Sequence, residues 1–114
     1  STAPTPTVAP QATTTDAAEM LVARGMRAGS RDNASEALAL FDEALTSRAV
    51  LPPQTVADVL DARGRARDQL GDSAGARVDY SGAAAILFSL GALARGLEIC
   101  REHRIPPPTP APTS

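Results

Sequence analysis

The chain has no lysine, no tryptophan, one cysteine and one histidine among its 114 residues, and Phe41, Tyr80 and Phe88 are its only aromatic residues. The single Cys100 excludes an intrachain disulfide and leaves the redox compartment open, and we expect it to be a small buried side chain on a helix. No Ser-His-Asp or Cys-His arrangement can be argued from the single His103, and no His/Cys cluster supplies the companion ligands that a metal site needs. We therefore expect no enzymatic activity, no metal and no cofactor.

Long hydrophobic runs and a charge of one sign are also absent. No stretch reaches the roughly 18 apolar residues that a membrane span needs, and the longest uncharged run, residues 80–94, is interrupted by serine and glycine. The net charge is −2 with both signs mixed, so nothing indicates nucleic acid or an anionic membrane surface as a partner. All eleven basic residues are arginine, which we interpret as a GC-rich coding bias. The length allows one domain at most.

Both ends of the chain are rich in proline, threonine and alanine and carry no charge. Residues 1–15 and 106–114 cannot bury enough apolar surface to fold, and their prolines favour extended or disordered conformations. Neither end resembles a signal peptide. A first residue other than methionine fits a cleaved mature product or a piece of a longer chain. Such tails are typical of exported bacterial proteins, so we expect an exported or cell-envelope protein, with the cytoplasm as the alternative location.

The part between the tails predicts five helices. Capping residues and apolar spacing place them at about 17–28, 34–48, 56–70, 74–89 and 92–103. The expected N-terminal caps are Asp16, Asn33, Thr55 and Asp72 or Ser73. Gly71 suits a left-handed helix end between the third and fourth helices. The fold class is therefore all-α.

A pattern of small and large residues occurs twice, and the two copies are 39 residues apart. Leu60-x2-Arg63-Gly64 is followed by Ala76-x3-Tyr80-x2-Ala83, and the earlier copy runs from Leu21 through Gly25 and Ala37 to Phe41 and Ala44. This pattern resembles the tetratricopeptide repeat (TPR), in which a pair of antiparallel helices meets at small residues and an aromatic residue fills the gap. The period exceeds the usual value of roughly 34 residues, so we expect an insertion in residues 46–54. A third Ala-Arg-Gly, at residues 94–96, indicates a half repeat.

The resemblance implies a short right-handed α-solenoid of five antiparallel helices in two and a half repeats. Its parts would be an N-terminal tail (1–15), a first repeat (16–51), a second repeat (52–88), a capping helix (89–105) and a C-terminal tail (106–114). In the TPR family the first helix of each repeat lines a groove that takes a peptide or a partner helix. Carried over by position, this partner-binding groove comprises Glu19, Val22, Met26, Asp58, Asp61, Arg65, Gln69, Leu93, Leu97 and Arg101.

Two features of this groove limit its function. The family's clamp for a C-terminal carboxylate needs lysine, asparagine and arginine, whereas this chain has Val22, Met26 and Ala62 at those places. The carboxylates of residues 58–72 could in principle do acid-base work, but the arginines between them favour a solvated, neutralised helix surface. We therefore predict a non-enzymatic adaptor that binds a protein or peptide, without chaperone-tail recognition.

Two other functions remain open. The matched tails would also suit a structural subunit anchored in a large assembly, and deletion of both tails separates that hypothesis from the adaptor. A third alternative is self-stacking through the uncovered end of the solenoid.

Overall fold

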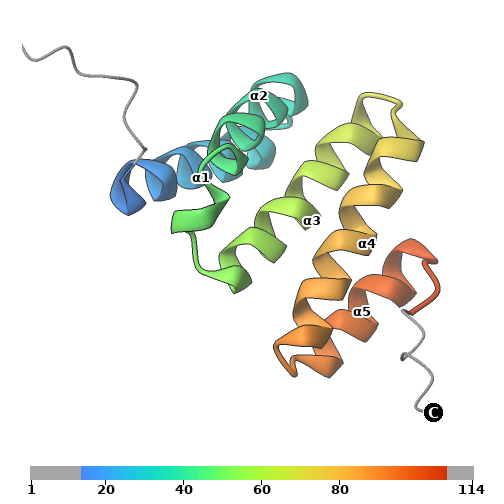
Figure 1. The fold of residues 1–114 in the computed structure, drawn as a ribbon. Coiled ribbons are helices and arrows are strands. Elements are labelled where there is room, and N and C mark those ends of the chain that lie inside the picture. The colour runs from blue at the N-terminus through green and yellow to red at the C-terminus, as the bar shows by residue number, and fades with distance from the viewer. Residues whose placement is uncertain (1–13, 108–114) are drawn as a thin grey trace, which may run out of the picture.

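The computed structural model describes residues 14–107, and every regular element within them is helical (Figure 1). The elements are α1 (Thr15–Ser30), α2 (Ala34–Leu45), the 3-10 turn η1 (Arg48–Val50), α3 (Pro53–Gln69), α4 (Ser73–Ser89) and α5 (Leu93–His103). The all-α expectation is confirmed for this part of the chain. The expectations for the tails concern residues that lie almost wholly outside it. None of the described helices is both long and apolar enough to cross a membrane.

The first and third helices begin earlier than the sequence predicts. Thr14 caps α1, because its Oγ1 accepts a hydrogen bond from the backbone N–H of Ala17 at 3.2 Å. Asp16, the expected cap, lies inside the first turn, where its charge suits the helix dipole. Pro53 opens α3, since the first helical position needs no N–H donor. The predicted caps at Asp16 and Thr55 are therefore wrong.

The caps of the second and fourth helices are confirmed. Asn33 Oδ1 accepts from the N–H of Glu36 at 3.2 Å, and Asn33 Nδ2 donates to Glu36 Oε2 at 2.9 Å. Asp72 Oδ1 accepts from the N–H of Gly75 at 2.9 Å. Gly71 has a φ of 89°, the left-handed conformation that the tight turn before Asp72 requires.

α2 is shorter than the sequence predicts, so the connection to α3 begins earlier than expected. α2 ends at Leu45 rather than at Arg48, and the chain then forms η1. Thr15 Oγ1 donates to the Val50 carbonyl at 3.3 Å, and the side chain of Leu51 is buried. The residues predicted as an inserted loop thus hold an ordered 3-10 turn against the start of α1.

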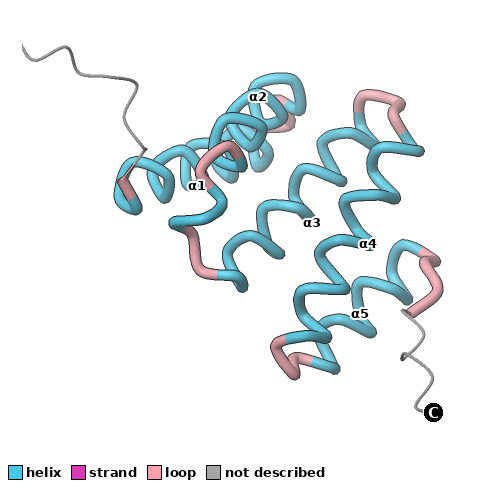
Figure 2. Tube along the Cα trace, in the orientation of Figure 1, coloured by secondary structure: helices cyan, strands magenta, loops and turns pink. Residues whose placement is uncertain are grey.

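Each helix packs against its neighbours in the chain, and α1 also contacts α3. α3 and α4 lie side by side and run in opposite directions, and the connections are short (Figures 1 and 2). Two groups of buried side chains form, one around Phe41 and the other around Tyr80. α3 contributes Val59 to the first group and Leu60 to the second, so it is the wall between them.

The same glycine and ring packing occurs in both hairpins. A β-carbon added to Gly25 would lie 2.5 Å from Cε1 of Phe41, and one added to Gly64 would lie 2.5 Å from Cε1 of Tyr80. Each ring is 16 residues after its glycine, and the two pairs are 39 residues apart. The spacing that the sequence shows twice therefore corresponds to one packing arrangement that the structure contains twice.

Candidate functional site

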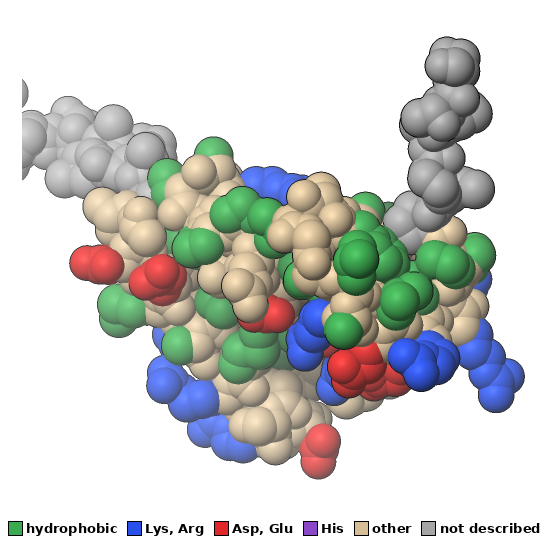
Figure 3. Space-filling model, turned by 90° about the horizontal axis from the view of Figure 1, so that it is seen from below, with side chains coloured by type: hydrophobic (Ala, Val, Ile, Leu, Met, Phe, Trp, Pro, Cys, Tyr) green, Lys and Arg blue, Asp and Glu red, His purple; other side chains and the backbone are tan. Residues whose placement is uncertain are grey.

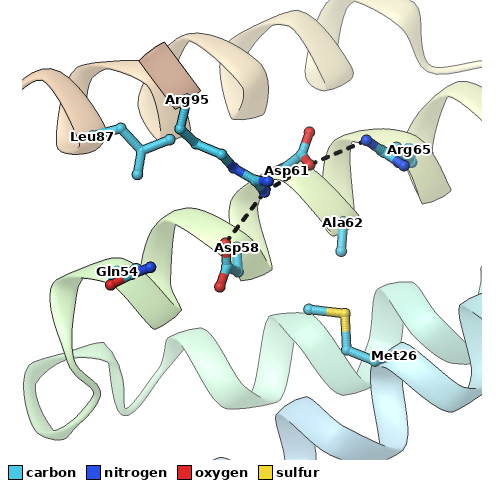
Figure 4. Close-up of a pocket in the computed structure, with 8 residues that line it drawn as sticks. All are labelled: Met26, Gln54, Asp58, Asp61, Ala62, Arg65, Leu87 and Arg95. Atoms are coloured by element: carbon cyan, nitrogen blue, oxygen red, sulfur yellow. Dashed lines mark hydrogen bonds and ion pairs between the residues drawn. The ribbon is translucent and has the colours of Figure 1, made fainter. Parts of the chain in front are cut away.

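A hollow of about 550 Å³ opens between α1, α3 and α5, next to a second one of about 300 Å³ towards the ends of α1 and α3. Both are lined by Met26, Ala62 and Arg65, so they form one continuous surface, which we call the α1–α3 groove. In the close-up, Met26 points from α1 towards α3, and Arg95 reaches in from α5 (Figure 4). The other lining residues are Gln54, Asp58, Asp61 and Leu87 in the first hollow, and Gly29, Ser30, Ala34, Ala37, Phe41, Ala66 and Gln69 in the second.

Ion pairs join α3 to α5 along one side of this groove. Arg95 Nη2 lies 3.5 Å from Asp58 Oδ1 and 4.0 Å from Asp61 Oδ2. Arg65 Nη2 lies 3.2 Å from Glu102 Oε1 and 3.4 Å from Asp61 Oδ2. All except Asp61 are about half exposed, so each pair contributes little to stability. These side chains can therefore exchange their ion-pair partners for charged groups of a ligand with little loss of folding free energy.

Asp61 connects the groove to a stacked pair of rings. Its Oδ1 lies 3.4 Å from Nε2 of His103, and neither atom has a hydrogen bond among residues 14–107. The contact is therefore within ion-pair distance but lacks hydrogen-bond geometry. The His103 ring stacks on Tyr80 with 3.4 Å between centroids and 4° between planes, and Tyr80 Oη donates to Asp68 Oδ2 at 2.7 Å. Side chains of α3, α4 and α5 thus meet at Tyr80.

The Tyr80 hydroxyl is expected to resist ionisation. Burial raises its pKa, and the hydrogen bond to Asp68 and the charge of that carboxylate raise it further. Because the folded-state pKa lies above the unfolded value of about 10, the stabilisation is complete below pH of about 10 and is lost as the pH rises towards the folded-state pKa. Tyr80 is the only tyrosine, so absorbance near 295 nm should show no phenolate through the normal tyrosine range while the chain stays folded. An Asp68→Asn variant should ionise at lower pH, and a normal wild-type titration would contradict the prediction.

The structure brings together half of the residues expected in the partner-binding groove. Met26, Asp58, Asp61 and Arg65 line the first hollow, and Gln69 lines the second together with Met26 and Arg65.

The other expected residues lie elsewhere. Glu19 and Leu93 are exposed and line neither hollow, and Val22 is half-buried against both groups of core side chains. Leu97 and Arg101 line a separate hollow of about 320 Å³ with Cys100, Ile105 and Pro107. α5 therefore turns Arg95 and Glu102, rather than its leucines, towards α3.

Several groove residues escaped the sequence analysis. Gln54 lies in the first turn of α3, which was expected to be loop, and Leu87 lies on α4, a helix not expected to reach the groove. Arg95 belongs to the third Ala-Arg-Gly, and its opposite charge to Asp58 was the one available signal.

The groove combines charged and apolar side chains. Its carboxylates and guanidinium groups neutralise one another, and its floor of Met26 and Ala62 is apolar. No cluster of three or more metal-ligating side chains occurs in the described part of the chain.

Comparisons with protein-family models, curated proteins and solved structures gave no significant match.

Proposed function

We propose that this protein is a non-enzymatic protein-binding module, a short right-handed TPR-like solenoid that holds a peptide or a partner helix in the α1–α3 groove. The observation that carries the proposal is the continuity of two hollows across α1 and α3, with Met26 and Ala62 as an apolar floor. The repeated packing of Gly25 on Phe41 and Gly64 on Tyr80 supports a repeat architecture.

The proposed ligand contacts follow from this lining. An apolar side chain of the ligand would lie on Met26 in the hollow that Ala37, Phe41 and Ala66 extend. Polar groups of the ligand would meet Asp58 and the half-exposed Arg65, whose ion pairs within the chain are weak. Affinity would come mainly from the apolar contact and orientation from the charges.

Substitution of groove residues tests the proposal. Displayed peptides selected on the wild-type chain should bind Met26→Glu and Arg65→Glu at least tenfold more weakly, which corresponds to about 1.4 kcal/mol. Met20→Glu is the matched control, because Met20 is on the same helix but is 65% exposed and outside the groove. Arg65 is half exposed, so its substitution tests the groove without threatening the core. Equal binding by all three variants would place the ligand elsewhere.

A further inference from the structure

Three leucines form an exposed ridge at the C-terminal end of the molecule. Leu90, Leu93 and Leu97 are 48%, 56% and 43% exposed, and they are three of the seven large hydrophobic side chains exposed among residues 14–107. Hydrophobic side chains gather over the end of the molecule that carries α5 (Figure 3). Leu93 and Leu97 are four residues apart, so they lie on one face of α5. Scattered exposed leucines are ordinary, but three within eight residues at one end of the molecule make a candidate contact surface.

A hollow continues this ridge along the same edge. It has a volume of about 320 Å³ and is lined by Leu97, Cys100, Arg101, Ile105 and Pro107. Leu97 belongs to both features, so the ridge and the hollow form one surface, which we call the α5 edge. The three leucines project from the surface, whereas the hollow next to them is recessed.

The exposed leucines of the α5 edge lie on a side of α5 that no other helix covers among residues 14–107. Gly96 and Ile99 are buried on the side towards α4, and Arg95 and Glu102 extend towards α3. A stack of helices needs a polar outer face on its last helix to remain soluble on its own. The α5 edge exposes leucines instead, so this end of the stack is suited to a further helix.

We propose that the α5 edge binds the same edge of a second copy, with the two α5 helices antiparallel about a twofold axis. A twofold contact requires a surface that is complementary to itself. An antiparallel pairing centred between Glu98 and Ile99 of α5 places Leu97 against Cys100 of the second copy. Leu97 of each copy thus lies at the hollow of the other, once on each side of the axis.

The charges on α5 also favour an antiparallel pairing. Glu98 and Arg101 are both exposed, and neither has an ion pair among residues 14–107. In the antiparallel pairing, Glu98 faces residue 99 of the other copy, two residues from Arg101. That offset is about 3 Å along the helix, which the two long side chains can span to form two ion pairs across the axis. A parallel pairing would instead place Glu98 next to Glu98 and Arg101 next to Arg101.

The size of α5 sets the strength of this contact. The helix has 11 residues, so two of them bury less than the area of about 1,200 Å² at which stable interfaces begin. We therefore expect reversible association with a dissociation constant between roughly 10 μM and 1 mM.

Sedimentation equilibrium of the full chain over that concentration range tests the proposal. The wild-type mass should rise from one chain towards two, and Leu93→Glu with Leu97→Glu should keep it at one. The matched control is Met20→Glu with Val78→Glu, which adds the same charge at exposed apolar residues of other helices and should leave dimerisation unchanged. A chain that stays monomeric throughout would overturn the proposal and leave the α5 edge to another partner. Dimers that survive both leucine substitutions would place the contact elsewhere.

Charge reversal tests the antiparallel register. Glu98→Arg and Arg101→Glu should each weaken dimerisation several-fold, and the variant with both changes should recover it. A double variant as weak as either single one would overturn the antiparallel arrangement. Met26→Glu should leave dimerisation unchanged, so failure of the groove proposal and failure of this one give different results.

Discussion

Gly64→Ala is expected to lower the free energy of unfolding by about 2–3 kcal/mol, the upper part of the range for overpacked cores. The new β-carbon would lie 2.5 Å from Cε1 and 2.8 Å from Cδ1 of Tyr80. The ring cannot retreat easily, because His103 stacks on it at 3.4 Å and Asp68 holds its hydroxyl. The intrinsic preference of helices for alanine over glycine, about 1 kcal/mol, acts in the opposite direction and is too small to compensate. Urea unfolding followed by circular dichroism measures the difference.

Two other glycines provide the controls. Gly25→Ala should be destabilising to a similar extent, since its β-carbon would meet Phe41 at the same distance. Gly29→Ala should instead be neutral or stabilising by up to about 1 kcal/mol, because nothing lies within 4 Å of its added β-carbon. If all three substitutions had the same sign, the close approach of glycine and ring would not be what selects glycine at residues 25 and 64.

These glycines also explain why the hairpins could be predicted from the sequence. The contact between Gly64 and Tyr80 is set by residues 16 apart in one hairpin, so the sequence contains the whole of it. The caps at Asn33 and Asp72 are equally local. The number and order of the helices were predictable for this reason.

The side of α5 that faces the groove was not predictable in the same way. The third Ala-Arg-Gly indicated only a half repeat, with no partner ring for Gly96. Instead, a β-carbon at Gly96 would lie 3.2 Å from Cζ of Phe88, which precedes it by eight residues. This contact with α4 sets the rotation of α5, and it places Arg95 rather than Leu93 beside α3. A contact between helices that share no repeated pattern has no signature in the sequence.

The burial of Asp79 was likewise not predictable. Its counterpart in the first hairpin, 39 residues earlier, is Leu40, which is buried against apolar neighbours. Asp79 is also buried, and its side chain is only 1% exposed. A buried carboxylate on α4 requires cations from the neighbouring helix α3. Sequence spacing alone does not show which arginines of α3 reach it.

Arg63→Met is expected to destabilise the fold by about 3–5 kcal/mol, the usual result of removing one partner of a buried ion pair. Arg63 donates to Asp79 through Nε at 3.1 Å and Nη2 at 2.7 Å, and to Asp42 at 3.0 Å. These carboxylates, Asp79 foremost, raise the pKa of Arg63, which favours the charged guanidinium. Without it, the buried carboxylate keeps only Arg67, at 3.2 Å. Thermal or urea unfolding gives the difference directly.

The variant that combines Arg63→Met with Asp79→Leu should recover most of that loss, because replacing both members of a buried pair with apolar side chains is often neutral or stabilising. Leu40 shows that the corresponding site of the first hairpin accepts leucine, so the substitution has a precedent within this molecule. Arg67 would then lose its buried partner, but it is 24% exposed and can turn towards solvent. Arg48→Met is the control, since Arg48 is exposed in η1 and should change stability little. If the double variant were as unstable as Arg63→Met alone, the cost would lie in the packing of Arg63 between α2 and α4 rather than in the unpaired charge of Asp79.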